Sequence, residues 1–217
     1  DMTIPMEFLL FVLSSFILSS CSQEIHENKT AVRGGVRYHQ GTNELVTGTV
    51  ESFYENGRLK FRGNYKQGKQ DGFSEWFNGN GQLWVKENYK DGKEDGLFES
   101  FHDNGRLWKR KNYKEGKKHG LSESYFENGQ LWFRENYKDG EWDGLFEGFH
   151  DNGQVSRRGS YKNGKQEGLH EFFHANGQLL RRENYKDGTR NGPTEWFDEA
   201  GRLTKVETYK DEILLKF

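Results

Sequence analysis

Apolar residues, cysteine and net charge are all scarce in this sequence. Only 32% of its 217 residues are hydrophobic, which is too few for one large buried core. Cys21 is the single cysteine, so an internal disulfide is excluded. Residues 21–217 carry 32 basic and 32 acidic residues, because Asp1 and Glu7 are the only charges before them. This balance lacks the clustered positive excess that phosphate binding needs, and it argues against nucleic acid as a partner.

Aromatic residues and glycines, by contrast, are abundant. Aromatic residues make up 15% of the chain, with 17 Phe and 10 Tyr, and there are 27 Gly. A disordered polar chain carries far fewer aromatic residues, so we expect this chain to be ordered but thin. A single-layer β array satisfies both expectations.

The segment Gly96–His119 is repeated with substitutions from about residue 48 onward. An Asn-Gly pair recurs every 24 residues, with Ala200-Gly201 in the seventh place, and a Tyr-Lys pair keeps the same step. A fixed period of this length is typical of stacked repeats in which each unit contacts mainly its neighbours. We therefore divide the chain into residues 1–20, residues 21–47 and a seven-copy array over residues 48–217.

The first twenty residues contain the one sustained apolar run, Phe8–Leu18. Its length suits the hydrophobic region of a secretory signal and is too short to span a bilayer comfortably. The run ends at Leu18-Ser-Ser-Cys21, which resembles the lipobox of bacterial lipoproteins, where the cysteine carries the lipid. We expect a lipid anchor on Cys21 and a location in the bacterial cell envelope, facing the periplasm or the surface.

Residues 21–47 lack the period and are polar, so we interpret them as a tether. Arg37–His39 and Glu44–Val46 are candidates for a degenerate first strand or N-terminal cap, because the terminal units of repeat arrays are usually atypical.

Each repeat is expected to be a β-hairpin, because turn signals every ten to fourteen residues leave no room for a helix of typical length. The turns of the unit Gly72–Lys93 are Gly79-Asn-Gly81 and Lys90-Asp-Gly92. A three-residue loop ending in a left-handed Gly81 sets Phe77 opposite Leu83, and it also predicts Trp76 opposite Trp84. The fold class is therefore an all-β, elongated, twisted antiparallel meander of seven hairpins, with about 14 strands.

This register assigns the repeated side chains to two faces. The structural face is predicted to hold Phe77, Leu83, Tyr89, Phe101, Leu107, Tyr113, Tyr125, Leu131 and Tyr137. The variable face is predicted to hold the candidate binding residues Trp84, Trp108, Trp132, Trp196, Lys86, Arg110, Arg134, Arg158 and Arg182. Aromatic residues and Arg are the types that carry interface energy, and the alternative is that these Trp side chains merely cover a thin sheet.

Two further series could suggest chemistry. His102, His150 and His174 share one position of the repeat, and a Glu recurs at another, from Glu51 to Glu195. Equivalent positions in adjacent hairpins are about 10 Å apart. That separation is too large for shared metal ligation. We predict no catalytic residue, metal or cofactor, and we expect the Glu series to pair with backbone or basic groups of neighbouring strands.

The pattern of Gly, an aromatic residue, Asn-Gly-x-Leu and Tyr-Lys-x-Gly resembles the MORN repeat variant of bacterial proteins, a family often labelled YwqK-like antitoxin. The resemblance covers residues 48 to about 211. It implies meandering β-hairpins that contact proteins or lipids rather than catalyse a reaction, and the antitoxin label implies a toxin partner.

Three functions remain open at this point. The first is a non-enzymatic, membrane-anchored scaffold that binds a protein or envelope partner. The second is a glycan or cell-wall binding array, because regularly spaced aromatic residues can stack on sugar rings. The third is an antitoxin-like protein that neutralises a toxin, and an enzyme is the most remote interpretation.

Overall fold

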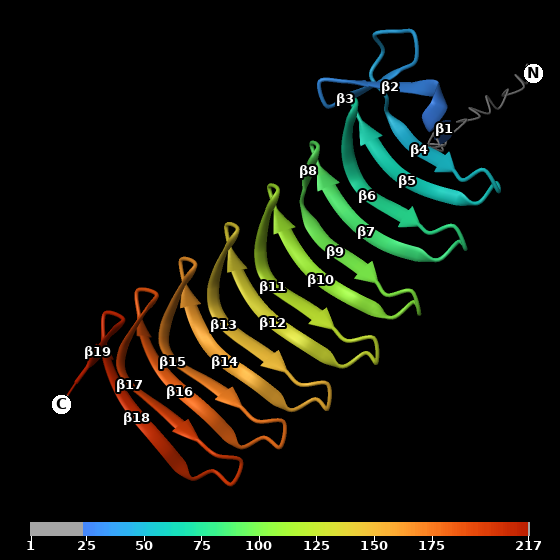
Figure 1. Cartoon of the computed structure of the whole chain (residues 1–217). Coiled ribbons are helices and arrows are strands. Elements are labelled where there is room, and N and C mark those ends of the chain that lie inside the picture. The colour runs from blue at the N-terminus through green and yellow to red at the C-terminus, as the bar shows by residue number, and fades with distance from the viewer. Residues whose placement is uncertain (1–23, 217) are drawn as a thin grey trace, which may run out of the picture.

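The computed structural model describes residues 24–216, which form an elongated antiparallel sheet (Figure 1). The strands lie side by side in chain order from β4 to β18, and all curve the same way (Figure 1). Seventeen strands form this sheet, and two more form a small separate one. The array strands are β4 (Gly48–Phe53), β5 (Leu59–Lys66), β6 (Lys69–Phe77), β7 (Leu83–Lys90), β8 (Lys93–Glu94), β9 (Gly96–Phe101), β10 (Leu107–Lys114), β11 (Lys117–Tyr125), β12 (Leu131–Lys138), β13 (Glu141–Phe149), β14 (Val155–Lys162), β15 (Lys165–Phe173), β16 (Leu179–Lys186), β17 (Thr189–Phe197), β18 (Leu203–Lys210) and β19 (Ile213–Leu215).

Two kinds of turn alternate along the array. At one end of the strands, Gly81 N–H donates to Asn78 O and Asn78 N–H donates to Gln82 O. These two hydrogen bonds close the predicted three-residue loop. Gly81 has a φ of 93°, as a left-handed position requires. At the other end of the strands, Asp91 and Gly92 have φ values of 50° and 85°, the two positive φ values of a type I′ turn. The prediction of punctuated hairpins is therefore confirmed.

A bulge at the start of each returning strand changes the predicted register. Phe77 lies opposite Leu83 as expected, but Trp76 lies opposite Val85, so Trp84 is an extra residue without a partner. The predicted Trp76–Trp84 pairing was therefore wrong. A β-bulge adds one residue to one strand, and every residue after it moves to the opposite face.

The bulge also separates the residues that were predicted to share the structural face. The Phe-Leu pairs remain together across the hairpin, since Phe101 lies opposite Leu107 and Tyr125 opposite Leu131. Tyr89, which lies opposite Gly72, falls on the other face of the sheet. The same displacement applies to the equivalent residues Tyr113 and Tyr137.

Most buried side chains of the array lie on one face, which we call the aromatic face. Its buried members include Val50, Phe61, Ser74, Ser122, Phe146, His170 and Thr194. Rings touch from strand to strand, with centroids 5.9 Å apart for Phe133 and Phe146 and 4.9 Å apart for His170 and Tyr185. Because no second layer of residues 24–216 covers this sheet, the core is one side chain thick.

Residues 24–46, which the sequence predicted as a tether with a possible cap, contain three strands and a short 3-10 helix. These elements are β1 (Glu24–His26), η1 (Glu27–Lys29), β2 (Thr30–Arg33) and β3 (Val36–His39). Strand β1 runs parallel to β4 and covers its edge, while β2 and β3 form the small sheet. Ile25 and Val46 are buried against Val50 and Phe61, so this segment closes the end of the array.

The predicted signal and Cys21 lie outside the described residues. Among residues 24–216, no helix is long and apolar enough to span a membrane.

Candidate functional site

The face opposite the aromatic face carries an ion-pair ladder, and we call it the charged face. Arg62 Nε lies 2.7 Å from Glu51 Oε1, Arg110 Nη2 2.9 Å from Glu99 Oε1, and Arg158 Nε 2.5 Å from Glu171 Oε2. Arg134 pairs with both Glu123 and Glu147, and Arg182 pairs with Glu195. The recurring Glu and the recurring Arg are thus cross-strand partners. Each of these partly exposed pairs contributes little to stability. Their main effects are to favour the observed strand register and to set the charge pattern of this surface.

A row of exposed apolar side chains runs beside this ladder. Leu121, Leu145 and Leu169 are 40 to 46% exposed, and Phe73 and Leu97 occupy the same position in earlier repeats. Each is two residues before a ladder Glu and so lies on the same face. We call these five residues the leucine row. Four of them are exposed and Leu97 is half-buried, so one position of the repeat presents apolar side chains beside the ladder, where a partner could cover them.

The exposed tryptophans lie on the other side of the sheet. The Trp132 ring lies 4.7 Å from the ring of its neighbour Phe133 and 5.4 Å from that of Phe126. Consecutive residues of a regular strand point to opposite faces, so this contact places Trp132 with Phe133 on the aromatic face, as the bulge allows. We call Trp84, Trp108 and Trp132, which are 48, 38 and 39% exposed, the tryptophan row.

The predicted binding face is therefore divided in two. Arg110, Arg134, Arg158 and Arg182 lie in the ladder, and Lys86 takes the same position opposite Glu75. Trp196 belongs to neither row, because it lies opposite Arg181 and Lys205 within the sheet, with Lys205 Nζ 4.8 Å from its ring centre. The predicted continuous surface of Trp and Arg was wrong, because the bulge was not foreseen.

A cleft of about 330 Å³ opens between the first two members of the tryptophan row. Its walls are Trp84 and Trp108, with Phe101 also lining it. The polar groups at its rim are Asp103 and Glu127 of the three-residue loops, with Asn78 and His102, which directly precede such loops.

The three recurring histidines join neighbouring hairpins. The Nε2 atoms of His102, His150 and His174 lie 2.9, 3.0 and 3.2 Å from the backbone oxygens of Tyr125, Phe173 and Phe197 in the next repeat. Tyr54 Oη donates to Phe77 O in the same way, at 2.7 Å. These groups are structural links. Within residues 24–216, no group of three His, Cys, Asp or Glu side chains is placed to hold a metal ion.

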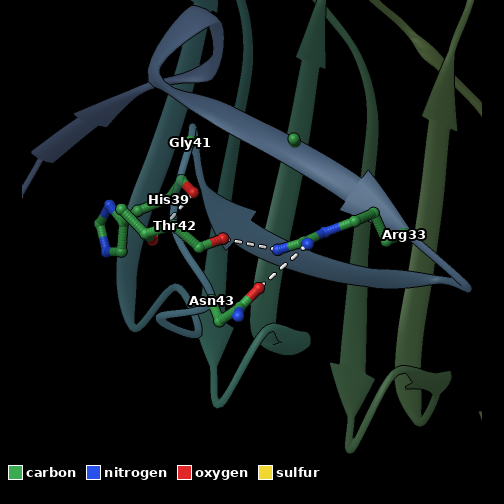
Figure 2. Close-up of a pocket in the computed structure, with 6 residues that line it drawn as sticks. Arg33, His39, Gly41, Thr42 and Asn43 are labelled. Atoms are coloured by element: carbon green, nitrogen blue, oxygen red, sulfur yellow. Dashed lines mark hydrogen bonds between the residues drawn. The ribbon is translucent and has the colours of Figure 1, made fainter.

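A second cavity lies in the N-terminal cap, between β2 and the loop after β3 (Figure 2). Figure 2 shows the Arg33 side chain reaching across this cavity to Thr42 and Asn43. Its guanidinium donates to Thr42 O at 2.6 Å and Asn43 Oδ1 at 3.1 Å, and it lies 4.0 Å from the centre of the Tyr38 ring. The Arg33 donors are thus used to hold the loop.

The family model for the MORN repeat variant matches six consecutive segments, which together cover more than half of the chain. The chain belongs to this family. The matched residues are 46–67, 70–91, 94–115, 118–139, 142–163 and 166–187. The hairpin formed by β17 and β18 follows the matched segments and repeats their pairing. MORN repeats of this kind indicate a repeat scaffold for protein or membrane interaction.

No curated protein matches the MORN chain. A TarM point mutant from S. aureus, crystallised with fondaparinux, alpha-GlcNAc-glycerol and UDP, is 14% identical over 55% of this chain and 21% of its own, with a TM-score of 0.31. A second crystal structure of TarM is 17% identical over 54% of this chain and 20% of its own, with a TM-score of 0.30. The MORN chain thus spans about a fifth of the length of these structures.

Tyrosine-glutamate pairs recur on the aromatic face of the MORN array. The hydroxyl groups of Tyr137 and Tyr185 donate to Glu135 at 3.0 Å and Glu183 at 2.9 Å. Burial, aided by the adjacent carboxylate, raises the pKa of each of these tyrosines to about 12. Both phenols are therefore protonated near neutral pH and act as hydrogen-bond donors that hold the Glu side chains.

Sequence reasoning missed the loop asparagine as a link between repeats, which it forms in five of the three-residue loops. Asn104 Nδ2 donates to Glu127 O at 3.0 Å, and Asn152 Nδ2 donates to Ala175 O at 2.8 Å. The same side chains accept from their own loops, as when Arg106 N–H donates to Asn104 Oδ1 at 2.9 Å. Gly alone would suffice for the turn, so the recurring Asn was the available signal for a second role.

Proposed function

We propose that this MORN chain is a non-enzymatic scaffold of the bacterial cell envelope that binds a protein partner along its charged face. A lipid on Cys21 would hold it at the membrane. The observation that carries the proposal is the leucine row, exposed beside a neutral ladder of ion pairs.

The leucine row and the ladder together have the composition of an interface. Apolar side chains such as Leu145 and Leu169 supply area that gains free energy when covered. The flanking Glu and Arg groups carry both signs in alternation, which favours a partner with complementary charges and fixes its register. An elongated partner segment could contact several repeats at once. The overall affinity would then exceed that of any single contact, because each further contact forms within the same complex.

Variants on the two faces test this proposal. We would capture envelope proteins with the full chain by cross-linking, identify them by mass spectrometry and measure binding of each purified candidate. Replacement of Leu121, Leu145 and Leu169 by Ser should weaken binding by at least about tenfold, or about 1.4 kcal/mol. The matched control replaces Trp84, Trp108 and Trp132 by Ser on the opposite face and should bind as the unchanged chain does.

Equal binding by the leucine variant would overturn the assignment of the charged face. The identity of the captured protein decides between partner classes, because a toxin among the candidates would support the antitoxin-like role. Both triple variants must first show melting temperatures near that of the unchanged chain.

The anchor requires a separate experiment. We expect Cys21→Ala to abolish incorporation of labelled fatty acid and to release the protein from the membrane fraction. A stable anchor would need two or more acyl chains on Cys21, since one chain binds a membrane only marginally. Membrane attachment that survives the substitution would contradict the lipoprotein proposal.

A further inference from the structure

We propose that the tryptophan row binds a linear carbohydrate, with its central subsite in the cleft between Trp84 and Trp108. This site lies on the opposite face from the proposed protein interface and is independent of it.

The fold does not require tryptophan at these positions. The bulge residue is Lys60 in the first repeat, Ser156 in the fifth and Thr204 in the seventh, and the same register surrounds each of them. Polar residues of different sizes are thus compatible with the bulge. Three consecutive tryptophans, each more than a third exposed, therefore leave ring surface for a ligand in addition to their contacts with neighbouring rings.

The spacing of the row suits a polymer of sugar rings. Equivalent residues in adjacent hairpins are separated by two strand spacings, or about 10 Å. That distance is comparable to the length of a disaccharide. One pyranose ring could stack on each indole, and a linear chain of sugars could continue from Trp108 to Trp132.

The polar rim of the cleft can hold sugar hydroxyl groups. His102 Nε2 donates to Tyr125 O, so Nδ1 is the ring nitrogen left for a ligand. Asn78, Asp103 and Glu127 contribute amide and carboxylate groups at the same rim. A few fixed polar groups around aromatic walls are the usual composition of a small-molecule site.

The charges around the cleft favour a neutral ligand over a cation. The Lys109 ammonium already lies 3.9 Å from the centre of the Trp108 ring. The Arg106 guanidinium donates to Glu127 O at 3.1 Å. These two cations balance Asp103 and Glu127, so the cleft lacks the negative excess that an organic cation would require.

Titration of the full chain with hexasaccharides of chitin, cellulose and starch tests this proposal. Binding is measured by tryptophan fluorescence and by calorimetry. At least one oligosaccharide should bind, and Trp108→Ser should weaken it by about tenfold or more, or about 1.4 kcal/mol. Leu180→Ser is the matched control, because it changes the same repeat position outside the tryptophan row and should leave affinity unchanged.

The length of the oligosaccharide gives an independent readout. Trp132→Ser should remove the gain in affinity from disaccharide to hexasaccharide and leave disaccharide binding intact. The proposal is overturned if no oligosaccharide binds, if Trp84→Ser and Trp108→Ser bind as tightly as the unchanged chain, or if tetramethylammonium titrates the fluorescence instead. Since Ser already occupies this position at Ser156, these variants are expected to remain folded, and melting curves check that they do.

Discussion

Single residues fill the thin core by complementary size. Gly159 faces the buried His170 ring, and a Cβ at this glycine would overlap that ring. Gly148 is similar, because its Cβ would approach Phe133 Cε1 to 3.0 Å. At these two positions the neighbouring strand therefore contributes only a hydrogen atom beside the ring. In a sheet with no covering layer, this lateral fit replaces packing between layers.

Gly159→Ala should destabilise the protein by about 1–3 kcal/mol, because the new methyl group forces the His170 ring out of its place. The matched control is Gly79→Ala, whose Cβ would meet nothing within 4 Å, and it should stay within about 0.5 kcal/mol of the unchanged chain. Urea unfolding of the two variants measures both. Equal midpoints would show that the lateral fit is not a constraint.

His170 should make stability depend on pH. Burial lowers its pKa below the ordinary value of 6.5, so the unfolded chain binds a proton that the folded protein resists. Stability should therefore fall as the pH drops through the histidine range, from about pH 8 to pH 5. His170→Phe keeps a ring in the same space and should flatten this fall. Parallel curves of melting temperature against pH for the two proteins would exclude His170 as the source.

At the scale of the hairpin, two turns and one bulge determine which side chains meet. The type I′ turn needs two residues with positive φ, and Asp91 and Gly92 supply them at 50° and 85°. The three-residue loop needs only Gly81 in the left-handed region. The turns fix where each strand begins, but the bulge determines which face each side chain occupies.

Asp91→Val should destabilise the β7–β8 turn by about 1–2 kcal/mol, since a β-branched residue is strained at positive φ. Asp91→Asn is the control and should be close to neutral, because Asn tolerates this conformation. Thermal melts measure the difference. A valine variant as stable as the asparagine variant would mean that another turn type can replace this one.

The sequence predicted the turns and the period better than it predicted the faces. Asn-Gly and Asp-Gly are local signals, and they identified the hairpins and the Phe77–Leu83 pair. The bulge residue has no such signal, because its position holds Lys, Trp, Ser, Leu or Thr in different repeats. Bulges depend on the partner strand as much as on their own residues. The predicted Trp-Arg surface therefore could not be corrected from the sequence alone.

At the scale of the whole molecule, the hydrogen bonds described between repeats join each repeat to its neighbour. The side-chain links of His102 and Asn104 reach backbone atoms 23 residues ahead. The turns at the other end of the strands form links of similar sequence separation. Asp91 N–H, for example, donates to Asp71 Oδ2, 20 residues earlier, at 3.2 Å. Each hairpin is thus supported by its neighbours, and the described residues of the cap cover one end of the array.

Removal of residues 120–143 should leave a folded β protein, because Gly144 then takes the place of Gly120 in the period. Removal of residues 120–131 breaks the period and should disrupt the sheet on both sides of the deletion. Circular dichroism and thermal melts compare the two. Similar melting temperatures for both deletions would contradict a 24-residue unit.

The strands lie across the long axis of the sheet, so the hydrogen bonds between them point along it (Figure 1). If the molecule is held at its N-terminal end and pulled at the other, the force acts perpendicular to the strands. The hydrogen bonds between the strands are then broken one strand pair after another. Such an array yields at low force and in equal steps, and it lengthens greatly before the chain is taut. We therefore expect a sheet of this shape to extend repeat by repeat under load, and each repeat to refold when the load is released.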